Sequence, residues 1–214
     1  MLLKEEREQV VEYCLKSMNA GLTNGTSGNI SIFNREKGLI AISPTGVEYD
    51  KMTAEEVSVV DLTGKVLEGK KPSSELEMHS LFYRRRTDIN AVIHAHTIYC
   101  TTIACLRQDL PAVDYMLAIA GGNNVRCAEY ATYGSDELAE NCFKSMEGRK
   151  AVLLANHGLT CGAVDIKNAL NIAIQVEYCA ELYVRAKSIG EPVILPDEEM
   201  EGMLEKFKSY GQIK

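Results

Sequence analysis

Tryptophan is absent from the 214-residue sequence, and positive charge is scarce, since 23 lysines and arginines stand against 30 aspartates and glutamates for a net charge of −7. A chain without an indole platform or a basic excess is a poor match for nucleic acid or for an anionic membrane surface. We therefore expect neither as a partner. An acidic protein still binds phosphate where backbone N–H groups form the site.

Long apolar runs are missing as well. No stretch approaches the roughly 20 residues of a membrane-spanning helix, and the first residues, MLLKEEREQ, turn charged without the apolar segment of a signal peptide. The seven cysteines form no CxxC pair, so we expect buried free thiols and a reducing, cytoplasmic location. Repeats, low-complexity tracts and linkers are also lacking, which predicts a single domain over residues 1–214.

The spacing of apolar residues predicts helices interleaved with strands. Helices are expected over residues 4–20, from 72–74 to about 86, and over 97–106, 134–147, 165–188 and 197–210. Strands are expected over residues 29–34, 38–43, 57–62, 90–96 and 151–156. Two capping boxes, Thr53 with Glu56 and Ser74 with Glu77, are predicted to begin helical turns. Regular βα alternation and a GxGxxG motif are absent, so we predict an α/β fold with a mixed sheet flanked by helices.

Two of the four histidines lie two residues apart at the end of the apolar segment NAVIHAH. On a strand, His94 and His96 share one face with Cα atoms roughly 6.5–7 Å apart, which suits two imidazoles that bind one metal ion. The other face carries the apolar side chains of Ala91, Ile93 and Ala95. The short HxH pattern alone leaves a metal site and a merely polar strand end equally open.

A third ligand would have to come from the two remaining histidines. His157 follows the strand-like AVLLAN, in a turn from which a side chain can project into a cleft. His79 lies within a predicted helix on the same side as Glu75, and a packed or Glu-paired helix histidine is the favoured interpretation. Three histidines with an open fourth position are typical of catalytic zinc. Glu75 itself is either a stabilising carboxylate at a helix start or an acid/base beside the metal.

A set of short segments, in this order along the chain, resembles the zinc-dependent class II aldolases and epimerases of ketose phosphates. The segments are GTSGNIS (25–31), SPTG (43–46), KPSSE (71–75), HAHT (94–97), YMLAIAGG (115–122), EYATYG (129–134), NHGL (156–159) and KFKSYG (206–211). The resemblance implies an α/β fold with a central, mostly antiparallel sheet between helical layers. It also implies a fourfold homotetramer with active sites at the subunit interfaces.

The resemblance further implies one Zn2+ per subunit, bound by His94, His96 and His157 with Glu75 at the metal. A phosphorylated sugar would be held at three hydroxyl-rich turns, each of which is by itself an ordinary turn or helix cap. The positions that correspond to the family's phosphate site are Gly28, Asn29, Thr45, Gly46, Ser73 and Ser74.

The reaction that the resemblance implies is reversible retro-aldol cleavage of a ketose 1-phosphate, with the branch that cleaves L-fuculose 1-phosphate to L-lactaldehyde as the nearest. A Lewis acid suits the enediolate left by this cleavage. A Schiff base is not expected, because the lysines lie in polar, turn-like segments. By resemblance, Tyr115 of an adjacent subunit takes the proton of the C4 hydroxyl, Glu75 protonates C3, and Tyr210 closes over the aldehyde end.

Alternatives remain open at this point. An L-ribulose-5-phosphate 4-epimerase of the same family shares the metal and the retro-aldol step, although the segment from Asp114 to Leu138 resembles the aldolases more. A non-catalytic, adducin-like interaction module is a third alternative. Tyr133 departs from the phenylalanine common in the nearest relatives, which makes the identity of the aldehyde an open question.

Overall fold

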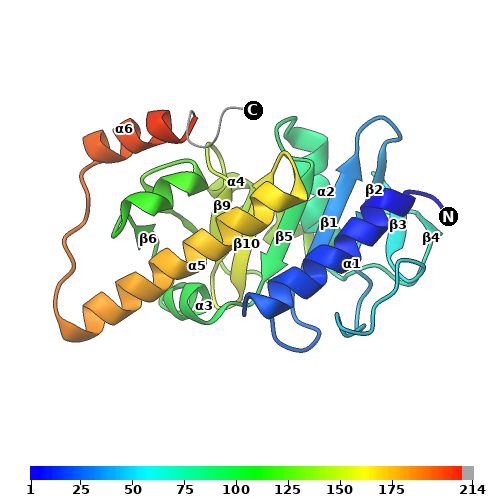
Figure 1. Cartoon of the computed structure of the whole chain (residues 1–214), viewed down its shortest axis with the longest axis horizontal. Coiled ribbons are helices and arrows are strands. Elements are labelled where there is room, and N and C mark those ends of the chain that lie inside the picture. The colour runs from blue at the N-terminus through cyan, green and yellow to red at the C-terminus, as the bar shows by residue number, and fades with distance from the viewer. Residues whose placement is uncertain (209–214) are drawn as a thin grey trace.

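The computed structural model of the chain describes residues 1–208, and within this range it contains an eight-stranded sheet with helices on both faces (Figure 1). The helices are α1 (Lys4–Asn19), α2 (Leu76–Arg85), α3 (Ile98–Cys105), the 3-10 helix η1 (Tyr115–Ala120), α4 (Asp136–Ser145), α5 (Ile166–Ile189) and α6 (Asp197–Lys208). The sheet strands are β1 (Asn29–Asn34), β2 (Leu39–Ile42), β3 (Ser58–Asp61), β4 (Val66–Glu68), β5 (Ala91–Ala95), β8 (Cys127–Ala128), β9 (Ala151–Leu154) and β10 (Gly158–Ala163).

Strand order in the sheet is β4-β3-β2-β1-β5-β10-β9-β8, and β8 with β9 is the parallel pair among otherwise antiparallel neighbours in the described range. A small separate pair joins β6 (Leu110–Pro111) to β7 (Asn124–Val125). The α/β fold with a central, mostly antiparallel sheet flanked by helices, expected from the sequence, is confirmed.

Each face of the sheet has its own apolar core. On one face, α1 packs on β1 and β2, while the long α5 packs on β5 and β10, and both helices lie in front of the sheet in Figure 1. On the other face, α2 and α4 pack together over residues such as Val92 and Val152. Strand alternation in β5 follows the prediction, because Ala91, Ile93 and Ala95 lie in the first core and Val92 in the second.

Local differences from the predicted elements have identifiable causes. Strand β10 was not predicted, because its sequence GLTCGA has two glycines and little β propensity; pairing with β5 and β9 on its two sides forms it. Thr53 N–H does donate to Glu56 Oε2 at 3.0 Å, but the segment forms a turn and no helix. Of the seven free cysteines, five are buried, whereas Cys105 is exposed.

Helix α3, which directly follows the HxH segment, is capped from outside its own segment. Its N-cap residue Thr97 makes no side-chain capping hydrogen bond. Instead, the Glu177 carboxylate of α5 accepts hydrogen bonds from the backbone N–H groups of Tyr99 at 2.8 Å and Cys100 at 2.9 Å. A carboxylate at this end is favoured by the helix dipole, and it ties the chain after His96 to the long helix.

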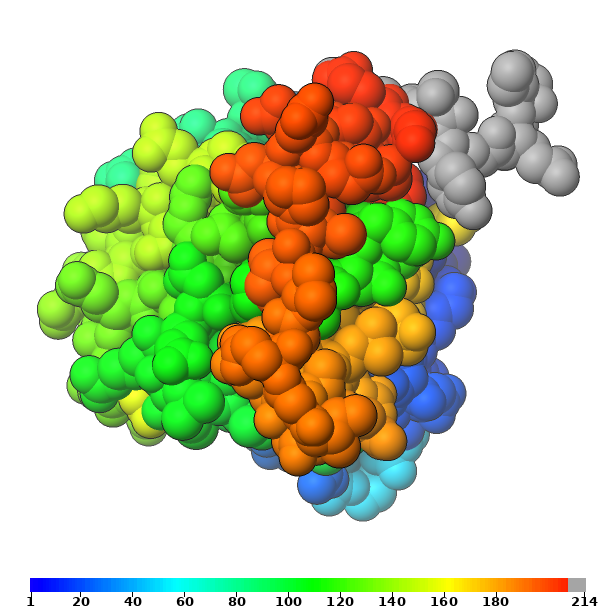
Figure 2. Space-filling model, turned by 90° about the vertical axis from the view of Figure 1, so that its left-hand side faces the viewer, coloured from blue at the N-terminus to red at the C-terminus, as the bar shows by residue number. Residues whose placement is uncertain are grey.

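An extended segment, residues 190–196, leads from α5 to α6 along one side of the molecule. Figure 2 shows it in orange, crossing the green segments around residues 110–120, with α6 in red above. Leu195 N–H donates to the Ala112 carbonyl at 2.9 Å, which anchors the crossing. Within residues 1–208, no helix combines the length and apolar character needed to traverse a bilayer.

The apolar face of β5 is expected to contribute much of the stability near the histidines. Ile93 is 1% exposed, so Ile93→Ala removes buried methyl groups and leaves a cavity. We expect a loss of about 2–5 kcal/mol in the free energy of unfolding, measured by urea titration. Ile189, which is 90% exposed, provides the control, and Ile189→Ala should change stability by no more than about 0.5 kcal/mol. Equal effects would contradict this account of the core.

Candidate metal centre and pocket

The end of β5 carries His94 in the centre of the sheet. In the antiparallel register, His94 lies opposite Asn29 of β1 on one side and Thr160 of β10 on the other. The His94 ring is fully buried, and His96, one residue beyond the end of the strand, is exposed at the edge of a pocket. The register therefore fixes the direction of the His94 imidazole before any side-chain contact is considered.

His157 lies in the tight turn between β9 and β10, after Asn156, whose backbone is left-handed with φ 53°. The turn directs the His157 ring at His94 and His96. Ring centroids of the three histidines are 4.7–4.9 Å apart, each pair meeting edge to face.

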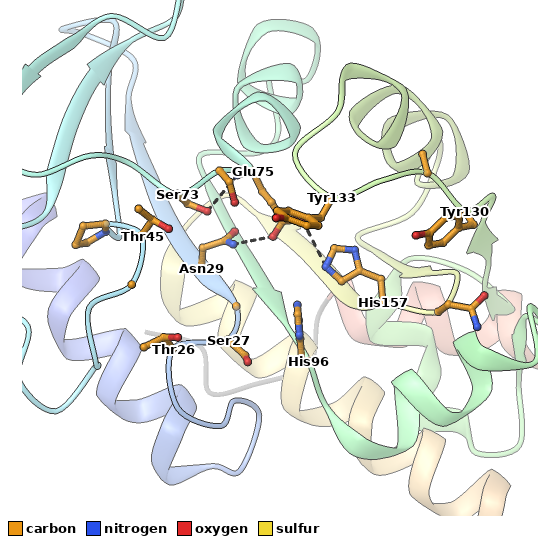
Figure 3. Close-up of a pocket in the computed structure, with 16 residues that line it drawn as sticks. Thr26, Ser27, Asn29, Thr45, Ser73, Glu75, His96, Tyr130, Tyr133 and His157 are labelled. Atoms are coloured by element: carbon orange, nitrogen blue, oxygen red, sulfur yellow. Dashed lines mark hydrogen bonds and ion pairs between the residues drawn. The ribbon is translucent and has the colours of Figure 1, made fainter.

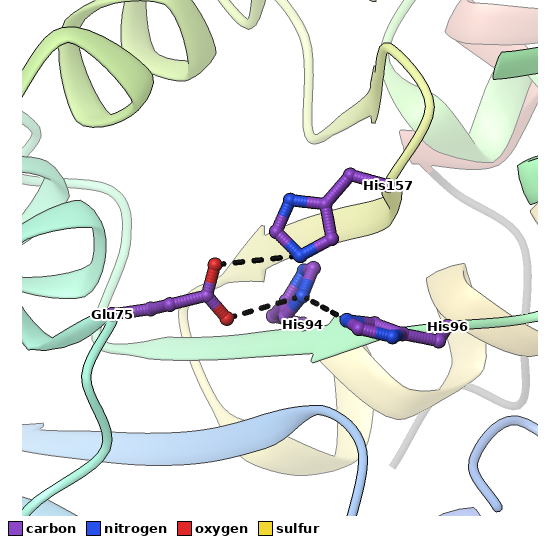
Figure 4. Close-up of side chains that lie close together, drawn as sticks. All are labelled: Glu75, His94, His96 and His157. Atoms are coloured by element: carbon purple, nitrogen blue, oxygen red, sulfur yellow. Dashed lines mark hydrogen bonds and ion pairs between the residues drawn. The ribbon is translucent and has the colours of Figure 1, made fainter. Parts of the chain in front are cut away.

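Glu75 completes the cluster from the opposite side (Figure 4). Its Oε2 lies 3.2 Å from His94 Nε2, and its Oε1 lies 3.5 Å from His157 Nε2. The carboxylate is 5% exposed. One ligand atom from each of Glu75, His94, His96 and His157 lies within 4.8 Å of all the others.

The chemistry of this donor set fits a metal ion. His94 Nδ1 lies 3.0 Å from the Leu159 carbonyl, which only accepts, so the proton is on Nδ1 and Nε2 presents its lone pair to the cluster. Because burial lowers the pKa of His94 to about 3, the ring stays neutral, the form that binds metals. A tetrahedral ion with bonds of about 2.0–2.1 Å spaces its ligands roughly 3.3 Å apart. Three ligand-atom pairs lie near this value, at 2.9, 3.2 and 3.5 Å, and all four ligand atoms lie within 4.8 Å of one another.

Glu75 Oε1 supports the same conclusion. This buried oxygen has no hydrogen-bond donor, which is costly for a carboxylate unless a cation is near. Burial raises the pKa of Glu75. The opposite effects of His94, His157 and the Asn29 amide together outweigh burial, so the pKa lies below its usual value. The side chain is therefore a carboxylate at neutral pH.

The position of Glu75 differs from the prediction. Helix α2 begins at Leu76 with Glu75 as its N-cap residue, and no side-chain capping hydrogen bond is made there, so the Ser74–Glu77 capping box is wrong. Glu75 N–H instead donates to Ser73 Oγ at 3.2 Å, and the Asn29 amide donates to Glu75 Oε2 at 2.9 Å. The Glu75 carboxylate therefore does not cap α2, and its contact with Asn29 points it into the histidine cluster.

A cavity of about 320 Å³ opens beside the cluster, lined by Glu75, His96 and His157 (Figure 3). All six residues that the resemblance assigns to phosphate line it as well: Gly28, Asn29, Thr45, Gly46, Ser73 and Ser74. Three segments far apart in sequence thus meet at one site. Their role in binding stays a prediction.

Close backbone approach explains two glycines at this site. Gly28 has φ +83°, and a Cβ built on it would lie 2.6 Å from the His94 carbonyl oxygen. Gly134 has φ +73°, and its Cβ would lie 2.8 Å from the Ser74 carbonyl oxygen. Any larger side chain at either position would require the neighbouring backbone carbonyl, that of His94 or Ser74, to move.

Several lining residues were not singled out from the sequence: Thr26, Ser27, Pro44, Tyr130, Ala131 and Asn156. All belong to or adjoin the quoted segments, so the hydroxyl-rich loop GTSGN was the available signal for Thr26 and Ser27.

Tyr133, suspected of facing the aldehyde, does line the pocket. Tyr115 is half exposed at the start of η1 and does not line this chain's pocket. Tyr210 lies outside the described residues.

His79 is not part of the metal cluster. It is fully buried, and its ring nitrogens contact Ser31 Oγ at 2.6 Å and Asn29 Oδ1 at 2.5 Å. The interpretation as a packed helix histidine is therefore correct, but its polar partners lie on β1 and are not Glu75.

The chain matches the family described as class II aldolase and adducin N-terminal domain over residues 8–184. It is 55% identical to a protein of Bacillus thuringiensis serovar kurstaki named 5-deoxy-D-ribulose 1-phosphate aldolase, over 99% of this chain and 100% of the relative. It is 44% identical to the L-fuculose phosphate aldolase of Escherichia coli strain K12, over 95% of this chain and 94% of the relative. A solved structure named L-fuculose 1-phosphate aldolase superposes with a TM-score of 0.94 at 53% identity, over 97% of this chain and 98% of that one.

These matches agree with the resemblance drawn from the short segments, and the relatives are named as aldolases of phosphorylated sugars. The prediction of an enzyme, as opposed to a non-catalytic module, is thereby confirmed. The chain belongs to the class II aldolase and adducin family, and it is one of the aldolases of that family.

Proposed function

We propose that this enzyme cleaves a deoxyketose 1-phosphate reversibly to dihydroxyacetone phosphate and a short aldehyde with a terminal methyl group. The observation that carries the proposal is the meeting, in one cavity, of the Glu75–histidine cluster with three hydroxyl-rich turns. L-Fuculose 1-phosphate and 5-deoxyribulose 1-phosphate, for which the relatives are named, are both substrates of this class. They share the dihydroxyacetone phosphate half and differ in the aldehyde.

The dihydroxyacetone phosphate half fits the wall formed by the turns. Hydroxyl groups of Thr26, Ser27 and Thr45 lie on one side of the cavity in Figure 3, and Ser73 lies beside Glu75. Backbone N–H groups and hydroxyls bind a phosphate without basic side chains, which suits the net charge of −7. We assign the phosphate to this wall.

Glu75 is the proton carrier in the proposed reaction. His94, His96 and His157, with Glu75 beside them, would hold a Zn2+ ion, which when bound acts as a Lewis acid that stabilises enediolate charge. Because Glu75 is ionised in the free site, it must first take up a proton from solvent when the substrate binds. Cleavage of the C3–C4 bond leaves an electron pair at C3, and Glu75 donates this proton to C3, which completes dihydroxyacetone phosphate and returns Glu75 to its carboxylate form.

The aldehyde end fits the opposite wall of the cavity. Tyr130, Ala131 and Tyr133 line this wall, and the two tyrosines are 53% and 69% exposed. Aromatic rings and an alanine methyl provide apolar surface for a terminal methyl group. We infer that this wall, and not the phosphate wall, sets the choice between aldehydes.

Tyr115 is proposed to act in a neighbouring copy of the chain. It would take the proton of the C4 hydroxyl, yet its side chain is 50% exposed and does not line the cavity of its own chain. A homotetramer with sites at subunit interfaces would bring it to the cavity of the next subunit. Tyr210 is proposed, by resemblance alone, to close over the aldehyde.

A panel of ketose phosphates tests the reaction and the substrate class. We expect L-fuculose 1-phosphate and 5-deoxyribulose 1-phosphate to release dihydroxyacetone phosphate, detected by coupled reduction with NADH. L-Ribulose 5-phosphate serves as the control, and its conversion to an epimer without release of a three-carbon phosphate would support the epimerase alternative. Failure of every 1-phosphate to release dihydroxyacetone phosphate would refute the proposal.

Removal of the metal tests the zinc assignment. We expect about one zinc per chain by elemental analysis, full loss of cleavage after dialysis against a chelator, and recovery with Zn2+ or Co2+. Chelator presaturated with zinc is the control for nonspecific inhibition. His96→Ala should lower bound zinc without unfolding the protein, because His96 is exposed. Full activity of a metal-free, folded chain would exclude a metal-dependent mechanism.

Hybrid oligomers test whether the site is shared between copies. Glu75→Gln and Tyr115→Phe should each lose most turnover, since each removes a proposed proton carrier. When the two variants are coexpressed and copurified, random assembly should restore about a quarter of the wild-type activity, because some interfaces combine an intact Glu75 with an intact Tyr115. If each site used Tyr115 of its own chain, every site would stay defective and no activity would return.

A further inference from the structure

A line of buried polar side chains connects the C-terminal end of α2 to Glu75, which precedes the first residue of that helix. Tyr83 Oη lies 2.5 Å from Ser31 Oγ, which lies 2.6 Å from His79 Nδ1. The other ring nitrogen, His79 Nε2, lies 2.5 Å from Asn29 Oδ1, and Asn29 Nδ2 lies 2.9 Å from Glu75 Oε2. All five residues are at most 5% exposed.

The negative charge of Glu75 fixes the protons of this line from Asn29 to Ser31, whereas the Tyr83 hydroxyl can also donate to the Ser31 carbonyl at 3.0 Å. A carboxylate only accepts, so Asn29 must turn its NH2 group to Glu75 and its carbonyl oxygen to His79. The carbonyl oxygen also only accepts, so His79 must carry its proton on Nε2. Nδ1 is then an acceptor for the Ser31 hydroxyl, which can itself accept from Tyr83.

His79 is neutral in this arrangement, and its function is therefore not to supply charge. Burial lowers its pKa to about 4, although Glu75 acts in the opposite direction. His79 lies one helical turn after Glu75 on α2, yet its ring reaches across to β1. It thus links the helix that carries the carboxylate to the strand that carries the amide.

The Asn29 side-chain amide can rotate by 180°, which exchanges its oxygen and nitrogen, unless its hydrogen-bond partners favour one orientation. The flipped amide would present an oxygen to the Glu75 carboxylate, and two acceptors at that distance repel each other. The His79 Nε2–H group opposes this flip, because only the observed orientation gives it an acceptor.

We propose that His79 is a positioning residue, whose Nε2–H group holds the Asn29 amide in the orientation that directs Glu75 at the reacting carbon. The inference rests on the proposed proton transfer by Glu75. It assigns to His79 no contact with the substrate and no binding of the metal. The loss of the Nε2–H donor should therefore slow proton transfer while metal and phosphate stay bound.

Two substitutions separate the two nitrogens of the ring. The side-chain amide group of glutamine reaches about as far as Nε2, and that of asparagine about as far as Nδ1. His79→Gln can therefore keep the donor to Asn29, whereas His79→Asn can keep only the contact with Ser31. Both introduce a similar amide into the same buried space. Tyr83→Phe is the matched control, because it removes a buried hydroxyl from the other end of the line.

The exchange of a carbon-bound proton of dihydroxyacetone phosphate with deuterated water isolates the Glu75 step. Without an aldehyde present, Glu75 removes a proton from the hydroxymethyl carbon and the electron pair enters the enediolate. The proton on the Glu75 carboxyl group then exchanges with deuterated water, and a deuteron returns from that group to the carbon. We expect His79→Asn to lower this exchange rate and the kcat of cleavage by about 10- to 100-fold, with KM and bound zinc little changed. His79→Gln should stay near the wild type, and Tyr83→Phe should lower the unfolding midpoint without slowing exchange.

Equal losses in His79→Gln and His79→Asn, or losses that follow stability or zinc content, would overturn the positioning inference and leave the proposed function intact. Absence of both exchange and cleavage in the wild type would overturn the proposed function and this inference with it. A second measurement requires no variant to fold well. In the zinc-loaded wild type with 15N-labelled histidine, the His79 ring should show a protonated Nε2 and a bare Nδ1, and the opposite tautomer would refute the inference.

Discussion

The antiparallel pairing of β5 with β1 and β10 is the constraint on which the site depends. It sets His94 directly between Asn29 and Thr160, in the middle of an eight-stranded sheet within the described range. A slip of one residue would turn His94 and His96 to the opposite face and bring Ile93 to the pocket side. The apolar residues of β5 prevent that slip, because their burial in the opposite core holds the register.

The same constraint explains why the chain tolerates so many polar groups in its interior. His94 and Glu75 are buried, and their nearest polar neighbours approach at 2.9–3.2 Å. Such a group of buried donors and acceptors stabilises the fold only if nearly every member is satisfied. Strand pairing fixes the spacing of these groups, and the remaining free lone pairs converge where a cation fits. The buried polar groups that would hold a cation therefore cost folding free energy. Burial of apolar side chains in the cores on both faces of the sheet offsets that cost.

The proposed phosphate wall illustrates how an acidic protein could bind an anion. Thr45, Ser73 and the loop before β1 bring hydroxyl and N–H groups to one wall, while the charged side chains stay largely at the surface. Gly28 and Gly134 have no Cβ atom, so the backbone at Gly28 can lie close to the His94 carbonyl and the backbone at Gly134 close to the Ser74 carbonyl. Within residues 1–208, this wall carries hydroxyl and backbone groups and no lysine or arginine side chain, so the net charge of the chain says little about its ligand.

By itself, the sequence determined the fold class, the pairing of His94 with His96 on one face, and the family. These follow from local rules, namely apolar periodicity, strand alternation and short ordered segments, each readable without knowledge of distant contacts. Only the tertiary structure decided that β10 is a strand, that Glu75 precedes α2 as its N-cap, and that His79 reaches Asn29 and not Glu75. The physical reason is that each feature includes a contact with a distant part of the chain, which forms only when the sheet does. Glu75 and His79 contact Asn29, 46 and 50 positions away, and β10 pairs with β5 as well as with the neighbouring β9.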